Sequence, residues 1–359
     1  MAIPRLEGAL IDPDCAPTVD SRASPPVDVA LQGILAPMSR LFRDVEGGRL
    51  SPHRSVVCIG AFDGLHCGHQ ALVRHTLARA RAIGADAVVI SFEPLPREFF
   101  MGAGAPPRIA SARDRIERLF ALGVDRVGVL RFNRRMANLS AEAFVQSLLV
   151  ERLAAAEIWV GEDFRFGHQR RGDVAMLQSL GAVHGFHAEA IDTHTHGGHR
   201  VSSSAVRKAL AEGRLDDVAV LLGRPYSVSA RVVRGKQLGR KLGFPTANMR
   251  VPGKVPAMQG IFATRIHGLF ENPWPAVSSQ GTRPTVSGNE VLLESHLFDI
   301  DIDLYGKRLE VEFVAKLRDE EKFDSLDALT EQMHRDAAAA RAVLGIGQPN
   351  QTTEEWMHA

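Results

Sequence analysis

The chain has 359 residues, with 43 Lys and Arg against 42 Asp and Glu, and 45% of its residues are hydrophobic. At about 150 residues per domain the length predicts two domains, while the balanced charge and the aromatic content of only 6% argue against a nucleic-acid-binding protein. No apolar run approaches the roughly 18 residues of a membrane-spanning helix, and three cysteines are too few for a disulfide framework, so we expect a cytoplasmic protein.

The two ends of the chain are expected to lie outside the folded domains. Residues 1–34 combine several prolines with scattered acidic residues and show no apolar period, which predicts a flexible extension. Residues 346–359 are predicted to be a frayed tail. The folded part is therefore expected at 35–345.

Short apolar runs alternate with segments of helical spacing between residues 56 and 222. Strands are expected at 56–59, 87–92, 127–130 and 158–160, and helices at 70–83, 111–122, 141–153, 204–212 and 215–222. Strands that alternate with helices of about 10–15 residues are typical of a parallel sheet built from βαβ units. We therefore predict an α/β, Rossmann-like domain at 35–222.

The alternation stops after Arg224 and Pro225. Strands are expected at 227–234, 261–267, 276–279, 291–298 and 309–317, followed by one long amphipathic helix at 326–344. Runs of strands separated by glycine and proline turns predict a small antiparallel β-barrel with a terminal helix, at 223–345.

The segment GAFDGLHCGH at residues 60–69 follows the first buried strand. His66 and His69 are three residues apart, so on the first turn of a helix both rings face the same way. Two imidazoles beside the N–H groups of a helix N-terminus suit the oxygens of a triphosphate. A surface loop, or a transition-metal site with Asp63 as third ligand, is the alternative. The position directly after a strand favours phosphate chemistry.

A run of serines at 202–204 precedes the helix expected at 204–212. Their hydroxyls make them candidates for a helix N-cap that also binds phosphate. Arg207, one turn further on, can bind two phosphate oxygens with its guanidinium.

The glycine-rich segment VVRGKQLGRKLGFPTAN occupies residues 232–248. Such a segment can wrap phosphates with backbone N–H groups, although a plain β-turn is the usual structure of isolated glycines. Pro245 stiffens the next turn and presents Thr246 and Asn248 on one side of an extended chain. Neutral oxygen ligands of this kind, together with ATP oxygens, suit Mg²⁺.

Four stretches in the first half resemble the nucleotidyltransferase domain of bacterial bifunctional riboflavin kinase/FMN adenylyltransferases, also called FAD synthetases. They are GAFDGLHCGHQ from residue 60, SFEP at 91–94, GEDFRFGHQRRG at 161–172 and VSSSAVR at 201–207. The resemblance implies that ATP phosphates contact the loop at Gly60, Phe62, Asp63, Gly64, His66, Gly68 and His69, and that Ser203, Ser204 and Arg207 hold them from the opposite side. It also implies that Asp163, Arg165 and Arg170 lie by the nucleotide or the flavin.

The glycine-rich segment closely resembles the riboflavin kinase signature G-x-x-x-G-R-x-L-G-F-P-T-A-N. This resemblance implies an ATP site at Gly235, Gly239, Arg240 and Gly243, flavin near Pro245, and Mg²⁺ held by Thr246 and Asn248. The stretch LESHLFDIDIDLYG from residue 293 resembles a second kinase motif and places the general base at Glu294. A carboxylate suits removal of a proton from the 5′-hydroxyl of riboflavin.

The expected activity is the synthesis of FAD in two steps. The barrel domain would phosphorylate riboflavin to FMN with Mg²⁺ and ATP, and the α/β domain would transfer AMP from a second ATP to FMN. No tightly bound prosthetic group, nucleic acid or membrane is expected to take part. Ser279 and Ala230 depart from the asparagine and glycine usual in the kinase.

Three alternative functions are weighed against this one. They are a single-activity FMN adenylyltransferase with a weakened kinase half, a non-catalytic flavin-binding protein, and a transferase that adenylylates another phosphate-bearing acceptor. Five histidines between residues 184 and 199 suggest a metal site, but their spacing favours a solvated loop with a hairpin turn at Gly197 and Gly198.

Overall fold

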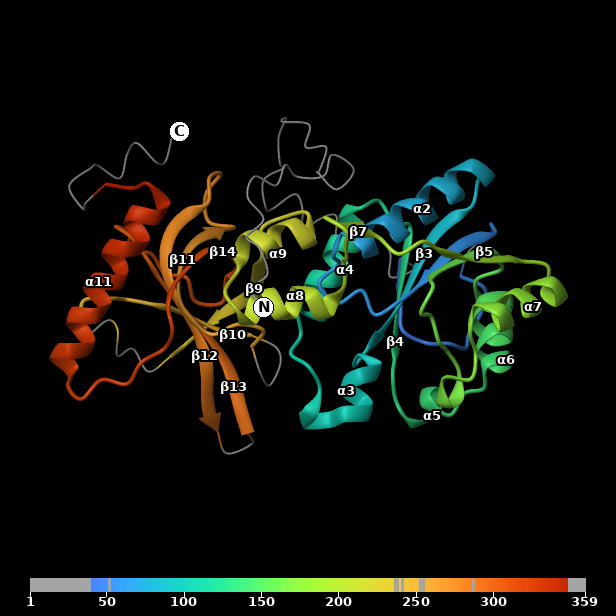
Figure 1. Ribbon diagram of the computed structural model, residues 1–359, viewed down its shortest axis with the longest axis horizontal. Coiled ribbons are helices and arrows are strands. Elements are labelled where there is room, and N and C mark those ends of the chain that lie inside the picture. Colours follow the sequence, from blue (N-terminus) through green and yellow to red (C-terminus); the bar gives the residue numbers. More distant parts are fainter. Residues whose placement is uncertain are drawn as a thin grey trace. The chain divides into compact units, whose positions relative to one another are not determined.

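The computed structural model describes residues 40–50, 53–235, 239, 242–251, 256–285 and 288–347. These residues form two compact units (Figure 1). The sheet unit consists of residues 40–106 and 112–202, and the barrel unit of residues 107–111 and 203–347. The extension expected at 1–34 lies outside the described residues, and so do residues 348–359 of the tail expected at 346–359.

The sheet unit is built on six parallel strands. Their order is β1 (Leu41–Phe42), β4 (Arg126–Arg131), β3 (Asp86–Glu93), β2 (Ser55–Ile59), β5 (Ala155–Gly161) and β6 (His187–Ile191). The connections contain α2 (Cys67–Ile83), α3 (Pro96–Met101), η2 (Gly102–Gly104), α4 (Ala112–Ala121), α5 (Arg134–Ala137), α6 (Ala141–Phe144), η3 (Val145–Arg152), η4 (His168–Arg170) and α7 (Val174–His184). A short hairpin pairs β7 (Thr195–His196) with β8 (His199–Arg200).

Helices cover both faces of this sheet, which explains why its central strands are continuously apolar. Val57 and Ile59 of β2 pack in one cluster with residues of α6, η3 and α7. Val56 and Cys58, which point to the opposite face, pack with residues of α2 and α4. All five residues of β2 are buried, so this strand lies in the centre of the unit.

The barrel unit contains a closed antiparallel barrel. Its strands follow one another around the barrel in the order β10 (Ala247–Val251), β13 (Gly288–Leu297), β12 (Trp274–Thr285), β11 (Gly260–His267), β14 (Arg308–Arg318) and β9 (Ser227–Val233). Before the barrel come α8 (Ser203–Ala211) and α9 (Leu215–Leu222), and after it α11 (Leu326–Leu344). The Ser325 hydroxyl caps α11 by accepting a hydrogen bond from the N–H of Ala328 at 3.1 Å.

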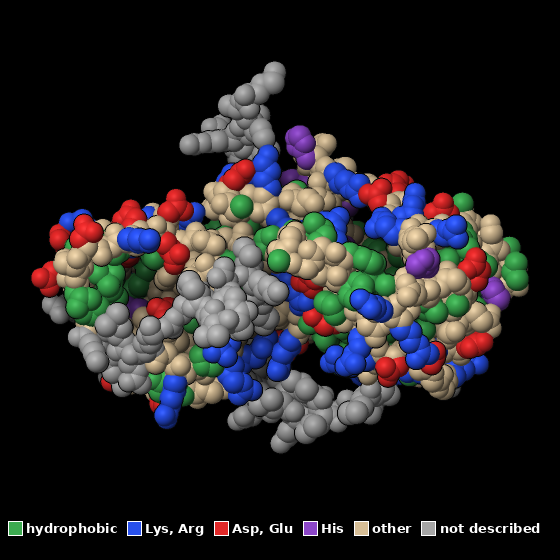
Figure 2. Space-filling model, turned by 90° about the horizontal axis from the view of Figure 1, so that it is seen from below, with side chains coloured by type: hydrophobic (Ala, Val, Ile, Leu, Met, Phe, Trp, Pro, Cys, Tyr) green, Lys and Arg blue, Asp and Glu red, His purple; other side chains and the backbone are tan. Residues whose placement is uncertain are grey.

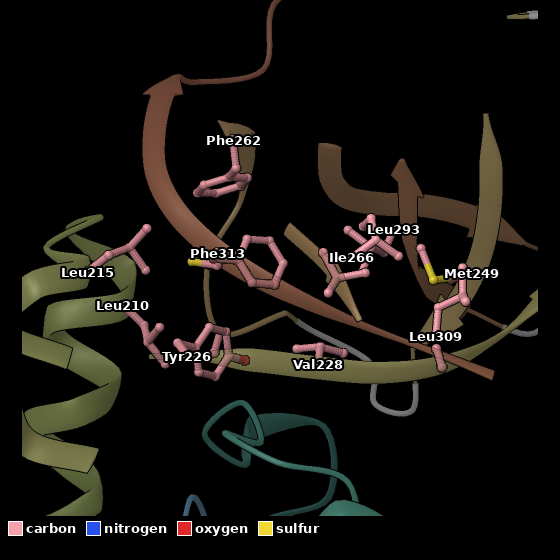
Figure 3. Packing of buried hydrophobic residues seen from close by; sticks show 14 of the residues in the cluster. Leu210, Leu215, Tyr226, Val228, Met249, Phe262, Ile266, Leu293, Leu309 and Phe313 are labelled. Atoms are coloured by element: carbon pink, nitrogen blue, oxygen red, sulfur yellow. The ribbon is translucent and has the colours of Figure 1, made fainter. Parts of the chain in front are cut away.

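One apolar core joins the barrel interior to α8 and α9 (Figure 3). Met249, Leu293 and Phe313 point into it from the strands, and Leu210 and Leu215 from the helices. The short segment 107–111 contributes to the same core, since Ile109 is only 2% exposed and the Tyr226 hydroxyl donates to its carbonyl at 3.2 Å. The core of the barrel unit therefore includes residues from two separate stretches of the sequence, 107–111 and the stretch from residue 203 on.

The predicted fold class is confirmed: a parallel sheet with helices, an antiparallel barrel and a terminal helix. Helices α9 and α11 have the predicted bounds. Strand β10 was not among the predicted strands, and the single helix predicted at 141–153 is instead α6 followed by the π-helical η3. Within the described residues, no helix is long and apolar enough to span a membrane.

Candidate functional site

The phosphate loop, residues 60–69, connects β2 to α2 at the carboxyl end of the parallel strands. The N–H of Gly60 donates to the carbonyl of Ile90 at 3.0 Å and continues the pairing of β2 with β3. Beyond it the backbone is left-handed at Phe62 (φ 50°), Gly64 (φ 82°) and Leu65 (φ 47°). Glycine adopts this conformation freely, whereas the other two residues are strained in it, so the surrounding structure must hold the loop.

His66 and His69 lie together at the N-terminus of α2. His66 is the N-cap, and its Nδ1 accepts a hydrogen bond from the backbone N–H of His69 at 3.3 Å. The two rings stack with their centroids 3.6 Å apart. Because Nδ1 of His66 accepts, the neutral ring carries its proton on Nε2, where it can donate to an anion. No acidic residue in the first turn of α2 opposes such an anion.

The neighbours of the two histidines leave little free space. The fully buried Phe62 ring lies 5.2 Å from the His69 ring. A Cβ at Gly68 would come within 3.4 Å of the His66 ring, and Asp63 is 2% exposed. The backbone of the loop is therefore packed closely under the two imidazoles.

The metal alternatives gain no support from the structure. Among the described residues, no group of three His, Cys, Asp or Glu side chains is arranged to hold a metal ion. The five histidines are spread over several elements: His184 ends α7, His187 begins β6, and only His196 and His199 lie on the strands of the β7–β8 hairpin. Gly197 (φ 56°) and Gly198 (φ 77°) make the turn of that hairpin. The predicted hairpin turn is thus present.

The stretch 161–172 follows β5, the strand next to β2, and so lies at the same edge of the sheet as the phosphate loop. Phe166 and Gly172 close it through two backbone hydrogen bonds of 3.0 and 2.9 Å. Asp163 forms an ion pair with Arg200, and Arg165 and Arg170 are exposed. These three predicted residues therefore lie at the same edge of the sheet as the phosphate loop. Their contacts with a ligand stay predictions.

Ser203 and Ser204 are the first two residues of α8, which begins one residue before the predicted start at 204. Arg207 is half-buried, and its Nε donates to the carbonyl of Pro107 at 2.7 Å. These three residues belong to the barrel unit. Their role with the histidines of the sheet unit stays a prediction from the resemblance.

A second group of predicted residues lies together on the barrel. Asn248 of β10 pairs directly with Glu294 of β13, and Glu294 pairs on its other side with Ser279 of β12. Asn248 is 8% exposed, and its Nδ2 donates to both the carbonyl and the hydroxyl of Thr246 at 3.2 Å. Asn248 and the half-buried Glu294 on adjacent strands, and Thr246 directly before β10, therefore form one polar group.

Close backbone approach explains the predicted glycines of the glycine-rich segment. A Cβ on Gly235 would lie 2.4 Å from Cγ of Asn248, and one on Gly239 would lie 2.3 Å from the carbonyl oxygen of Phe244. Gly243 has a φ of 82°. Arg240, predicted to bind ATP, lies outside the described residues.

His296 is a residue of this site that the sequence reasoning missed. Its Nδ1–H donates to the carbonyl of Pro245 at 2.9 Å, and its ring lies 5.0 Å from that of Phe244. Burial lowers the pKa of His296, which favours the neutral ring. His296 therefore holds the turn that carries Thr246. Its spacing of two from Glu294, on the same face of a strand, was the available signal.

The sequence reasoning also did not predict an aromatic cluster in the sheet unit. The rings of Phe92, Phe99, Phe100 and Phe132 contact one another edge to face, with centroids 5.2 to 5.7 Å apart. Phe92 is the penultimate residue of β3, Phe99 and Phe100 lie in α3, and Phe132 directly follows β4. Phe100 is 66% exposed. A large exposed aromatic ring at the ligand-binding edge of a parallel sheet is a candidate contact for a flat apolar ligand.

Basic and acidic side chains are interspersed over the face of the molecule in Figure 2. This distribution agrees with the formal net charge of +1. The described surface in this view is therefore not dominated by a single sign of charge.

Two family models match the chain in succession: FAD synthetase at residues 49–205 and riboflavin kinase at residues 222–344. The bifunctional riboflavin kinase/FMN adenylyltransferase of Escherichia coli K12 is 42% identical over 311 residues, which are 86% of this chain and 99% of that protein. That of Pseudomonas fluorescens is 43% identical over 305 residues, 85% of this chain and 97% of the relative. A crystal structure described as a macrolide-efflux protein from Streptococcus pneumoniae has a TM-score of 0.70 and 27% identity, and covers 84% of this chain and 98% of that one.

Proposed function

The chain belongs to the family of bifunctional riboflavin kinases/FMN adenylyltransferases, and from this premise we propose which residues carry each of its two reactions. The enzyme phosphorylates riboflavin with ATP to give FMN, and transfers AMP from ATP to FMN to give FAD. Both family models match this chain, and it covers almost the whole length of relatives whose names give both activities. These matches favour neither a single-activity enzyme nor a non-catalytic flavin-binding protein.

The kinase reaction is assigned to the polar group on β10 and β13. Glu294 accepts the proton of the riboflavin 5′-hydroxyl while that oxygen bonds to the γ-phosphorus of ATP and the bond to ADP breaks. The observation that carries this assignment is the direct pairing of Glu294 with Asn248 across two adjacent strands. The pairing brings a carboxylate beside a residue that the resemblance assigns to Mg²⁺.

Thr246 and Asn248 fit a magnesium ion that accompanies ATP. Nδ2 of Asn248 is used toward Thr246, so Oδ1 is the atom with which this amide can bind a cation. Mg²⁺ prefers such oxygen ligands and shares phosphate oxygens, whose negative charge it neutralises when bound. The close approach of Gly235 to Asn248 lets the glycine-rich segment reach the same place.

The adenylyl transfer is assigned to the phosphate loop. A phosphate oxygen of FMN attacks the α-phosphorus of ATP, and pyrophosphate leaves with the electrons of the broken bond. His66, through its Nε2–H, together with His69 and the N-terminus of α2, stabilises the negative charge of the phosphates. Ser203, Ser204 and Arg207 are proposed to assist.

The exposed ring of Phe100 and its aromatic neighbours are proposed to contact the flavin ring of FMN, because aromatic rings favour offset stacking with other flat rings. Asp163, Arg165 and Arg170, at the same edge of the sheet, are proposed to bind its polar parts or those of the nucleotide.

Since both reactions consume ATP, we place the enzyme in the cytoplasm with small molecules as its partners.

A time course with riboflavin, ATP and Mg²⁺, separating FMN and FAD by chromatography, tests these assignments. The wild type should form FMN before FAD. His66→Ala should accumulate FMN, and Glu294→Gln should form no FMN but still convert supplied FMN to FAD. Equal FAD formation by His66→Ala and wild type, or FMN formation by Glu294→Gln, would contradict the respective assignment.

A further inference from the structure

Among the residues that the structure describes, Arg115 of α4 is the largest fully buried side chain, and it is only 2% exposed. Arginine is rarely buried unless its charge and its donors are satisfied. Here the guanidinium reaches the carboxyl ends of two adjacent strands. Nη1 donates to the carbonyl of Ala61 at 3.1 Å, and Nη2 to the carbonyl of Phe92 at 3.0 Å. Nη2 also pairs with Glu93 at 3.1 Å.

The Ala61 carbonyl receives a second donor, the hydroxyl of Ser91, at 3.0 Å. Ala61 directly precedes Phe62, whose left-handed backbone is strained. A strained conformation persists only where its surroundings over-determine it. Arg115 of α4 and Ser91 of β3 provide this constraint at the start of the loop, whereas the two histidines lie at its end.

Phe62 passes the constraint on to the histidines. Its buried ring packs against His69, and the His69 ring stacks on His66. A chain of contacts therefore leads from the guanidinium of Arg115, through the Ala61 carbonyl, to the two imidazoles.

We propose that Arg115 is a positioning residue for adenylyl transfer: it holds the phosphate loop in the shape in which His66 and His69 bind the phosphates of ATP. The proposal rests on the function proposed above for this loop. The planar guanidinium is needed because one group must reach two carbonyls and a carboxylate, which the single ammonium of lysine cannot match in geometry.

The test compares Arg115→Met and Arg115→Lys with wild type in the full-length enzyme, using FMN, ATP and Mg²⁺. The KM for ATP should rise at least tenfold in Arg115→Met and by a smaller factor in Arg115→Lys. A loss of folded protein would instead lower kcat at unchanged KM. Riboflavin phosphorylation by the same preparations, a reaction of the other unit, should stay within twofold of wild type.

Arg126→Met is the matched control. Arg126 is the first residue of β4 and pairs with Asp86 at the start of the adjacent strand β3, where its Nε lies 3.1 Å from the Asp86 carboxylate. It should leave the KM for ATP within twofold of wild type. If Arg115→Met does not fold, Ser91→Ala carries the test, because it removes the other donor to Ala61 and should raise the same KM several-fold.

An unchanged KM for ATP in the Arg115 variants, or an equal rise in Arg126→Met, would overturn the proposal. His66→Ala, measured in parallel, separates this failure from that of the proposed function. If His66→Ala impairs adenylyl transfer and the Arg115 variants do not, only the positioning role is wrong. If His66→Ala has no effect either, the assignment of the loop is itself wrong.

Discussion

Replacing Ile109 by alanine should destabilise the barrel unit, although residue 109 lies within the stretch matched by the FAD synthetase model. Its side chain is 2% exposed in the core that contains the barrel interior. Ile109→Ala removes three buried carbon groups at about 0.8 kcal/mol each and leaves a cavity, which together give about 3–4 kcal/mol. For a unit of this size the midpoint of thermal unfolding should fall by roughly 6–16 °C.

The assay is thermal unfolding of the barrel unit, followed by the fluorescence of Trp274 in a chain that carries Trp159→Phe and Trp356→Phe. Trp274 is buried in β12. The control is Ile83→Ala, an isoleucine 44% exposed at the end of α2, which should change stability by less than about 0.5 kcal/mol. An unfolding midpoint of Ile109→Ala equal to that of Ile83→Ala would refute the assignment of segment 107–111 to the core of the barrel unit.

Three further predictions follow from particular contacts. Arg318 donates two hydrogen bonds of 2.8 Å to the buried carboxylate of Asp336, so Asp336→Ala leaves this guanidinium without its partner. The substitution should lower the free energy of unfolding, measured by denaturant titration, by about 3–5 kcal/mol. A loss below about 1 kcal/mol would contradict this. The hydrogen bond to Glu312 raises the pKa of His267 above its ordinary value of 6.5. The difference in unfolding free energy between wild type and His267→Gln should therefore be largest below pH 6.5 and shrink as the pH rises through the raised pKa. A difference that does not change between about pH 5.5 and 9 would disprove the coupling. Gly235→Ala should lower riboflavin phosphorylation at least tenfold and leave FMN adenylylation unchanged, since its methyl group would overlap the Asn248 side chain; equal losses of both activities would exclude this local cause.

The elements that sequence reasoning predicted well are those with a strong local pattern. Helix α11 has a long amphipathic repeat, an N-cap serine and a terminal glycine, and its predicted bounds are those observed. Strand β10 was missed because ANMRV has no regular alternation and follows a glycine-rich stretch that resembles a loop. Its strand character comes from pairing with β13 and β9, which are distant in sequence.

The candidate sites show the same limit. His66, His69, Thr246 and Asn248 are close in sequence to their neighbours in space, so motif spacing was enough to single them out. Arg115 was invisible because an arginine in an amphipathic helix is normally solvated, and only the tertiary structure shows its burial under the carbonyl of Ala61. Such residues cannot be found from spacing along one chain.

The composition of the barrel unit bears on how the two activities can be separated genetically. A gene split between residues 205 and 222, where the two family matches leave a gap, would produce a kinase without Ile109 and without at least the start of α8. A cut near residue 222 would remove all of α8 and most of α9. The apolar surfaces that these residues cover would then face water in the kinase fragment. Because segment 107–111 lies upstream of half of the sheet unit, no single cut yields two fragments with intact cores. The connectivity therefore opposes fission of the fused gene, independently of any advantage in passing FMN from one reaction to the next.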